Sequence, residues 1–577
     1  MTTAQHLVHA YETGLGLEPS ALDDEPAPGA RLAATLPVWA LAAGSVAAAA
    51  GSANRYRAAL GLATRPTRLD PARIAAAFAS ERLFRQGESA PSAFAELSGF
   101  FRSADGWVRT HANYPHHRAR LLRALDLPAD TDRTRLAAAV ATRKGAEIED
   151  VAAVVGAIAV RVRTEAEWSA SPMGRAAAAG PLVAVDSRTD RPPTESTRPG
   201  AAAPTIDRPL ADVRVLDLTR VLAGPVATRT LALLGADVLR VDPPHLPEID
   251  WQFSDTCQGK RSTLLDLRSD LATFEDLLAA ADVLVTGYRP GALAAAGVRA
   301  AARPGLIEAS VSAWGTTGPW GGRRGFDSIV QAASGIALLE GDADSPGALP
   351  AQALDHGSGY LLAAGVMDAL RARAEDGAGR DVRVSLARTG SWLRAADRHP
   401  DHPAPLPPDP AATNRHGDIV TAAPAFADYD DYAGPPRRTA RPSRSGSKHP
   451  TTSTATDRPR GGSRSLPRQR PDRGRQLVTV GHRPARVQQP QHAQSLHQRE
   501  IQPPDGVGLC RVEFGVRRPD GGREVGERVG ELVTELSARV VGAHDAHDVL
   551  QAGQHGLVVV GEHRGHRVPQ TGEPGQR

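Results

Sequence analysis

The sequence has little cysteine: Cys257 and Cys510 are the only two among 577 residues, and they lie far apart. A disulfide scaffold and a CxxC metal or redox site are therefore excluded. The N-terminus lacks the basic segment and early apolar core of a secretory signal. The most apolar stretch, residues 36–51, is short and mostly Ala and Gly, which makes a poor membrane span. We therefore expect a cytoplasmic protein with no membrane segment.

An excess of one charge is also lacking, because the formal net charge is only +3. This near balance gives no reason to expect a nucleic-acid partner for the folded part. The segment "DLTRVLAGPVATRTL", residues 217–231, lacks the three glycines of GxGxxG, so the usual dinucleotide fingerprint is absent. Gly224 and Pro225 still make a sharp turn into a helix. Its free N–H groups could face an anionic ligand, or the turn could pack without one.

Tryptophan and methionine are absent from residues 396–577, which hold 12 of the 19 histidines. A chain of this length predicts at least two folded units. Residues 396–577 are rich in Arg, Pro, Gly, His and Gln, and their apolar residues show no period. They cannot bury enough surface to offset chain entropy. We predict a low-complexity tail there, either disordered or translated out of frame.

Residues 1–185 have apolar positions every three or four residues, which predicts a mainly helical region. Within it, residues 99–115 alternate around an Asp-Gly pair and predict a hairpin. A linker is expected at 186–209, where Pro, Ser, Thr and charged residues show no apolar period.

From 210 to 395 the pattern changes to short apolar runs that alternate with helical segments. The runs are 213–218, 236–242, 281–287, 305–313 and 380–387. Runs that are apolar on both faces belong to buried parallel strands, so we predict an α/β fold with a doubly wound, mostly parallel sheet. Such sheets bind ligands outside the carboxyl ends of their strands, which makes the loops after 218, 242, 287 and 313 the candidates.

Several side chains in these loops could carry chemistry. Lys260 and Arg261 are adjacent cations that suit a phosphate-rich ligand, although solvated surface charge is the commoner explanation. In "GYRPGAL", residues 287–293, Tyr288 could stack on a nucleotide and Arg289 could pair with it, or the segment could be an ordinary turn with Tyr288 in the core. Asp355 stands near a Gly-rich helix start in "QALDHGSGYLLAAGVMDAL", residues 352–370. It could cap that helix, whose N-terminus would also lower the pKa of Asp355 and keep it ionised for catalysis.

Six successive segments within residues 208–395 resemble family III CoA-transferases, the group related to carnitine and formate CoA-transferases. They are "RPLADVRVLDLTRVLAGPVATRTLALLGADVLRVDPP", "GKRSTLLDL", "ADVLVTGYRPGAL", "GFDSIVQAASG", "ALDHGSGYLLAAGVMDALRAR" and "GRDVRVSLARTG". The resemblance implies a Rossmann-like fold, usually an interlocked homodimer. It also implies that an acyl-CoA and a free carboxylic acid are the substrates, with coenzyme A as the carrier and no metal.

The resemblance implies roles for particular residues. The family's nucleophilic aspartate falls on Asp355, which would attack the thioester; the CoA thiolate would then form an aspartyl-CoA thioester that a second acid discharges. Backbone N–H groups near Gly357 and Gly359 are candidate oxyanion donors. The positions implied to line the CoA site are Arg220, Val221, Ala223, Lys260, Arg261, Gly287, Tyr288 and Arg324.

Two alternatives to a transferase remain. Alpha-methylacyl-CoA racemases share the implied fold but carry an acid/base His where this chain has Phe326, and Phe cannot exchange a proton. A transferase is therefore favoured over a racemase. The other alternative is a CoA-binding remnant without catalysis.

The chain also departs from the family's pattern. In relatives the small domain follows the large one, whereas residues 1–185 resemble small-domain material placed before it, as in a permuted or tandem-derived chain. Its histidines, His111, His116 and His117, are expected to be exposed loop residues. After residue 395 the resemblance stops, and we hypothesise a frameshift near 395–430.

Overall fold

The computed structural model describes residues 1–22, 24–190, 202–300, 303–436, 550–553 and 556–559. They belong to two compact units, Met1–Thr451 and Thr452–Arg577. The described residues of the second unit form an antiparallel hairpin of β14 (Leu550–Gly553) and β15 (Gly556–Val559). The first unit carries the candidate site.

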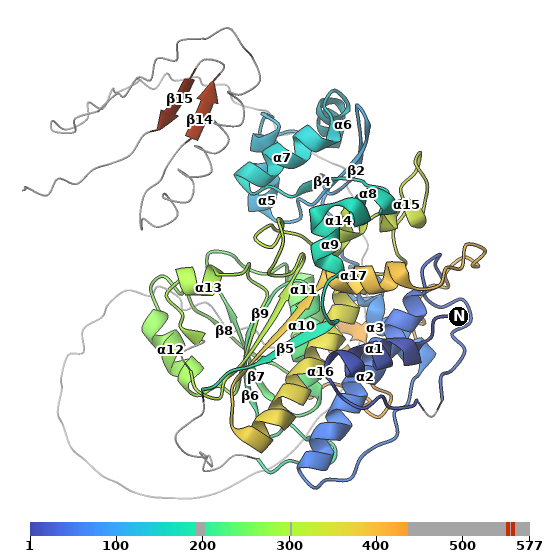
Figure 1. Cartoon of the computed structure of the whole chain (residues 1–577), viewed down its shortest axis with the longest axis vertical. Coiled ribbons are helices and arrows are strands. Elements are labelled where there is room, and N and C mark those ends of the chain that lie inside the picture. Colours follow the sequence, from blue (N-terminus) through green and yellow to red (C-terminus); the bar gives the residue numbers. More distant parts are fainter. Residues whose placement is uncertain (23, 191–201, 301–302, 437–549, 554–555, 560–577) are drawn as a thin grey trace, which may run out of the picture. The chain divides into compact units, whose positions relative to one another are not determined.

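A seven-stranded sheet forms the centre of the first unit, with strand order β5-β11-β10-β9-β6-β7-β8 (Figure 1). Its strands are β5 (Val183–Ser187), β6 (Arg214–Leu218), β7 (Asp237–Asp242), β8 (Arg261–Leu264), β9 (Val283–Thr286), β10 (Ile307–Ser312) and β11 (Arg380–Ser385). Every neighbouring pair is parallel except β5 with β11. The predicted α/β fold with a mostly parallel sheet is confirmed.

Helices cover both faces of the sheet because its central strands are apolar on both sides, and every residue of β9 is buried. α2 (Val38–Ala59), α10 (Ala223–Leu233) and α16 (Ala353–Asp376) contribute to the larger core on one face. α12 (Leu271–Ala279) and α13 (Ala292–Ala295) contribute to a second core on the other face (Figure 1). The remaining helices of this part are α11 (Asp250–Thr256), α14 (Asp327–Ala333), α15 (Ile336–Leu339) and α17 (Leu386–Ala395).

The N-terminal helices pack directly against α16. α1 (Ala4–Gly14) lies along α2, and α2 lies along α16. The buried carboxylate of Asp368 in α16 accepts a hydrogen bond from the Tyr11 hydroxyl of α1 (2.7 Å). It also accepts hydrogen bonds from Ser52 Oγ (2.7 Å) and Arg55 Nε (2.8 Å) of α2. One carboxylate therefore joins three helices.

Residues 97–161 form a subdomain with its own hydrophobic core. Its elements are β2 (Gly99–Ser103), β3 (Gly106–Thr110), α5 (Pro115–Ala124), α6 (Arg133–Ala141), α7 (Gly145–Val155) and β4 (Ala159–Arg161). β2 and β3 form the predicted hairpin. β3 and β4 pack against α14, so this subdomain covers part of the sheet domain. It is followed by α8 (Glu165–Ala170) and α9 (Pro172–Ala178), which lead to β5.

Two predicted boundaries, the start of the linker and the start of the tail, lie later in the structure than the sequence indicated. β5 runs to Ser187, so the linker expected at 186–209 begins later. Residues 397–436, expected to lie in the tail, pack in the first unit, where Phe426 and Tyr432 are buried. This stretch contains β12 (Thr413–His416) and β13 (Ile419–Ala422). The N-terminal elements beside it are α3 (Pro71–Phe78), α4 (Ser80–Leu83) and β1 (Arg85–Gln86).

β13 pairs with both β1 and β12, so residues far apart in the sequence share one small sheet. The sequence pattern missed this stretch because its apolar residues are few and irregularly spaced. Most of the predicted tail beyond 436 lies outside the described residues. The frameshift hypothesis therefore stays a prediction.

Replacing Asp368 with Ala should destabilise the first unit by about 3 kcal/mol or more, because Tyr11 and Arg55 lose a buried acceptor. Urea denaturation at neutral pH measures the free energy of unfolding. The control is Glu375→Ala on the same helix, whose exposed pair with Arg371 (2.6 Å) should contribute about 0.5 kcal/mol or less. Equal losses in the two variants would contradict the role given to Asp368.

Candidate active site

The N-terminus of α16 is capped by a side chain from another helix. Asp327, the first residue of α14, is buried, and its carboxylate accepts the N–H groups of Leu354 (2.8 Å) and Asp355 (3.0 Å). These are two of the donors that a helix start leaves free. The amide of Gln331 donates to the other oxygen of Asp327. The N-cap residue of α16 is Gln352, without a side-chain hydrogen bond, so the alternative in which Asp355 caps the helix is wrong.

Asp355 is the third residue of α16 and is only 6% exposed. No hydrogen bond or ion pair to its carboxylate occurs among the described residues. Burial raises the pKa of Asp355 well above its usual value, and the charge of Asp327 raises it further. Burial also raises the pKa of Asp327, to about 6, although the hydrogen bonds that it accepts oppose the rise.

The expectation that the helix N-terminus lowers the pKa of Asp355 is therefore wrong. Desolvation and a like charge both favour the protonated acid, and the pKa of Asp355 is raised. Two carboxyl groups stand side by side at the start of α16, and one of them has no protein partner in the described part of the chain. We call them the carboxyl pair.

Two buried histidines lie against Phe326, the residue before Asp327. The ring of His111 stacks on that of Phe326 with centroids 3.9 Å apart, and the ring of His117 lies 5.8 Å from it. Burial lowers the pKa of His111 to about 3 and that of His117 to about 2, so both imidazoles are neutral near pH 7. The expectation of exposed loop histidines is wrong for both, because α14 covers the segment that carries them; His116 alone is partly exposed.

Gly357 and Gly359 are not placed to bind an oxyanion. Both lie beyond the first turn of α16, where N–H groups bond within the helix. Their missing side chains allow close packing instead. A Cβ on Gly357 would come within 2.9 Å of Leu41 in α2, and one on Gly359 within 2.6 Å of the Ala223 carbonyl oxygen in α10. The predicted oxyanion role is therefore wrong, and Ala223 is a packing contact for α16.

The loop after β6 is held by the buried carboxylate of Glu248. Glu248 accepts hydrogen bonds from the Val221 N–H (3.0 Å) and from the Tyr114 hydroxyl. The guanidinium of Arg220 lies 3.6 Å from the same carboxylate. Val221 has a φ of 69°, a left-handed conformation that is strained for a β-branched residue. This strained loop contains two of the predicted CoA contacts, Arg220 and Val221.

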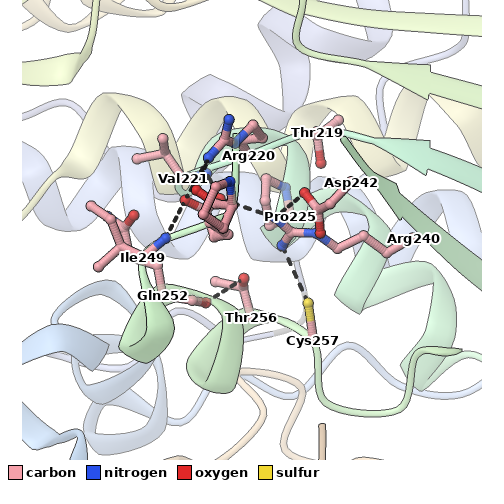
Figure 2. Close-up of polar contacts among 12 residues, drawn as sticks. Thr219, Arg220, Val221, Pro225, Arg240, Asp242, Ile249, Gln252, Thr256 and Cys257 are labelled. Atoms are coloured by element: carbon pink, nitrogen blue, oxygen red, sulfur yellow. Dashed lines mark hydrogen bonds and ion pairs between the residues drawn. The ribbon is translucent and has the colours of Figure 1, made fainter. Parts of the chain in front are cut away.

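A buried ionic network adjoins this loop. Arg240 donates to Asp242 (2.8 Å) and to Glu248 (3.0 Å), and its guanidinium lies 3.2 Å from the Cys257 sulfur (Figure 2). Burial would raise the pKa of Glu248, but the charges of Arg240 and Arg220 outweigh it and the pKa is lowered. Glu248 therefore stays an anion that ties the loop after β6 to β7.

Lys260 does not face a ligand. Its Nζ is buried and donates to the Asp217 carboxylate (3.0 Å), Thr228 Oγ1 (2.6 Å) and the Pro225 carbonyl (3.0 Å), which uses all three of its donors. The predicted CoA contact at Lys260 is therefore wrong.

Arg261 is a solvated surface charge, which was the alternative to a contact with a phosphate-rich ligand. It lies at the amino end of β8, is exposed, and pairs with Asp237 (2.7 Å) of β7. The amino ends of parallel strands form the edge opposite the one where such sheets bind ligands. The structure therefore separates Arg261 from the other candidates.

Four arginines line a cavity of about 310 Å³, which we call the arginine cavity: Arg120, Arg289, Arg323 and Arg324. Its described lining includes Trp320 and residues 153–160 of the subdomain, and contains no acidic side chain. Burial, together with the charges of Arg289 and Arg120, lowers the pKa of Arg324 to about 10. The cavity therefore concentrates positive charge that these lining residues do not neutralise.

The remaining candidates lie near this cavity. A Cβ on Gly287 would stand 3.8 Å from Thr219, so the loops after β6 and β9 adjoin. The ring of Tyr288 packs against the second core. This agrees with the alternative in which Tyr288 lies in the core and does not stack on a nucleotide. Burial is the main cause of a lowered pKa at His116, and the charges of Arg120, Arg220 and Arg324 lower it as well. The three arginines and His116 therefore lie in one region.

Sequence reasoning missed Asp327, Glu248, Arg109 and two arginines of the cavity. Asp327 stood in the quoted "GFDS" segment, where an acid at the start of a helix was a usable signal. Arg109 occupies a buried position of β3, and a charge within an apolar strand pattern was another. Glu248, Arg120 and Arg323 lie in segments without a distinguishing pattern, so only the fold brings them into view.

Two further observations concern the described residues only. No group of three His, Cys, Asp or Glu side chains there is arranged to hold a metal ion. Within the same ranges, none of the helices combines the length and the apolar character needed to cross a membrane. The described cysteine, Cys257, is buried and forms no disulfide.

Comparison with known proteins identifies one family. Residues 210–429 match the model of CoA-transferase family III, beyond the boundary at 395 expected from the sequence. Acetyl-coenzyme A transferase nodX of Hypoxylon pulicicidum is 36% identical over 34% of this chain and 35% of its own length. The probable fatty acyl-CoA transferase Rv3272 of Mycobacterium tuberculosis is 32% identical over 39% of this chain and 64% of its own. Acetyl-CoA:oxalate CoA-transferase of Acetobacter aceti is 34% identical over 31% of this chain and 51% of its own length. The chain thus spans between about one third and two thirds of these relatives.

Replacing Asp355 with Asn should change how stability depends on pH. Because its pKa is raised in the folded chain, protonated Asp355 stabilises the fold, and this stability is lost as the pH rises above about 4, the usual value in an unfolded chain. The variant should therefore become progressively more stable than the wild type as the pH rises from about 4 to about 8. Urea denaturation across that range measures it, with Glu375→Gln as the control. A difference that is constant with pH would show that the pKa is not raised.

Proposed function

Because residues 210–429 match the model of CoA-transferase family III, we propose that this chain transfers coenzyme A from an acyl-CoA thioester to a free carboxylic acid, with Asp355 as the nucleophile. One observation carries the proposal: Asp355 is buried at a helix start and its carboxylate has no partner in the described chain. A carboxylate that only stabilised the fold would be hydrogen-bonded or paired.

The arginine cavity is the proposed site for the phosphates of coenzyme A. Guanidinium groups form paired hydrogen bonds with phosphate oxygens, and four of them face this cavity without a carboxylate in its lining. It adjoins the loops after β9 and β10, at the edge where doubly wound sheets bind ligands. The proposal keeps Arg220, Val221, Gly287, Tyr288 and Arg324 near the ligand.

The chemistry divides one transfer into acyl exchanges. A carboxylate oxygen of ionised Asp355 attacks the thioester carbonyl carbon, the carbon–sulfur bond breaks, and CoA leaves as a thiolate. The thiolate attacks the Asp355 carbonyl carbon of the mixed anhydride and releases the first acid as its carboxylate, which leaves an aspartyl-CoA thioester. A second carboxylate repeats these steps in reverse order. Each intermediate retains the activation of the thioester.

The raised pKa of Asp355 fits this role. A carboxylate that is held in a buried site beside a second acid is a stronger base, and hence a stronger nucleophile, than one in water. The charge of a bound acyl-CoA and the cations around the site determine when Asp355 ionises. Asp327, whose carboxylate already accepts hydrogen bonds from α16, is the proposed positioning residue.

A second candidate function is α-proton exchange on an acyl-CoA. One observation favours it: the His111 ring is stacked on Phe326, so an imidazole lies against the residue that stands where the racemase pattern has a His. Deuterium incorporation at the α-carbon in D₂O would support this candidate, and tight CoA binding without exchange or adduct would support a remnant. A homodimer and a cytoplasmic location stay predictions.

Asp355→Asn should abolish formation of a covalent CoA adduct. The measurement is mass spectrometry of the Asp355 peptide after incubation with acetyl-CoA, with and without hydroxylamine, which cleaves acyl thioesters. The wild type and the control Glu375→Gln should both carry a hydroxylamine-sensitive adduct. An adduct of equal yield on Asp355→Asn would rule out this nucleophile.

Arg324→Met should weaken CoA binding about tenfold or more, because it removes a charged donor to a phosphate. Isothermal titration with coenzyme A at two salt concentrations measures the affinity and its salt dependence. Arg261→Met, at the opposite edge of the sheet, is the matched control and should change the affinity less than about twofold. If Arg261→Met has the larger effect, coenzyme A does not bind in the arginine cavity.

A further inference from the structure

Arg109 is a buried cation without a protein anion. It lies in β3 of the subdomain and is 8% exposed. No carboxylate in the described chain forms an ion pair with it, and its Nε has no hydrogen-bond partner there. The charge with the largest effect on its pKa is that of another cation, Arg133. Buried charges are ordinarily paired, because the desolvation of an unpaired charge is strongly unfavourable.

The contacts that Arg109 does make leave its donors free. Its guanidinium lies over the rings of Phe94 and Phe100, 4.8 Å from each centroid. Such rings cover the faces of a guanidinium, whereas its N–H groups point outward in the plane. Aromatic packing therefore explains why Arg109 is held in place and does not explain where its hydrogen bonds go.

Arg109 lies within electrostatic reach of the carboxyl pair. Its charge lowers the pKa of Asp327, and Asp327 raises the pKa of Arg109. Burial lowers the pKa of Arg109 only to about 10, so it is a cation at neutral pH. Two residues further along the chain is His111, whose neutral ring is stacked on Phe326 and whose Nδ1 has no partner in the described residues.

We propose that Arg109, assisted by His111, binds the carboxylate of the free acid that accepts coenzyme A. This inference rests on the proposed function. In the discharge of aspartyl-CoA, Asp355 is held as a neutral thioester, and the incoming carboxylate must approach the remaining acid of the pair, Asp327, in a buried site, where repulsion opposes it. Arg109 supplies the opposite charge that offsets this repulsion and the desolvation of the acid. A carboxylate oxygen then forms a bond to the Asp355 carbonyl carbon, and the CoA thiolate leaves.

The donor and the acceptor should therefore differ in their dependence on Arg109. An acyl-CoA enters with a neutral carbonyl at the carboxyl pair and carries its negative charges in phosphates, which are assigned to the arginine cavity. The free acid enters with its charge at the reacting group. Loss of Arg109 should raise the KM for the acid and leave that for acyl-CoA nearly unchanged.

The test separates the two half-reactions. The variants are Arg109→Met and Arg109→Lys, and the control is Arg102→Met, an exposed arginine of the same hairpin that lies over Trp107. Each protein is loaded with acetyl-CoA, and the adduct is discharged with increasing sodium acetate or sodium succinate. Arg109→Met should form the adduct within about twofold of the wild-type rate yet need at least about tenfold more acid for discharge. Arg109→Lys should restore part of the loss.

An unchanged acid dependence in Arg109→Met would overturn the proposal, as would a matching loss of acyl-CoA affinity. Thermal unfolding keeps the proposal testable if the wild type forms no adduct, a result that would count against the proposed function alone. Acetate or succinate should then raise the Tm of the wild type, relative to sodium chloride, and not that of Arg109→Met. Without added acid the variant should not be less stable than the wild type. A lower Tm in both Arg109 variants would assign Arg109 a structural role instead.

Discussion

The hydrogen bonds from the start of α16 to Asp327 determine the geometry of the candidate site. A helix start leaves several N–H groups free, and here a carboxylate from α14 accepts two of them. Asp355 is therefore not needed as a cap, and its own carboxylate is left without a protein partner among the described residues. The same contact brings a second acid beside it, which raises its pKa. A structural contact thus creates the chemical environment of the proposed nucleophile.

The cations around the site divide into two groups according to their partners. Lys260 and Arg240 are buried with carboxylates, so their charges stabilise the loops and leave nothing for a ligand. Arg109 and the arginines of the cavity are buried or enclosed without such partners in the described chain. Desolvation makes that arrangement costly for a protein alone. Cations that pair with a carboxylate therefore stabilise the fold. Cations without such a partner in the described chain lie where the anionic parts of a ligand are proposed to bind.

The sheet could be predicted from the sequence because each central strand is a short apolar run, and the hairpin because its turn and alternation are local. β5 was missed because it is separated from its partner β11 by almost two hundred residues. The packing of residues 397–436 was missed for a similar reason, since their partners lie near residues 73–86. The burial of His111 and His117 was not predicted because Phe326, whose ring lies against both, follows them in the sequence by about two hundred residues.

By itself, the sequence determined the fold class, the order of the parallel strands' segments and the identity of Asp355 as a candidate, because these depend on local periodicity and on motifs that the family resemblance makes specific. Only the tertiary structure decided which charges have partners. Lys260 and Arg109 are both basic residues in strand-like segments, yet one lies against Asp217 and the other against two aromatic rings. Partnering depends on which distant segments meet, and no local pattern carries that information.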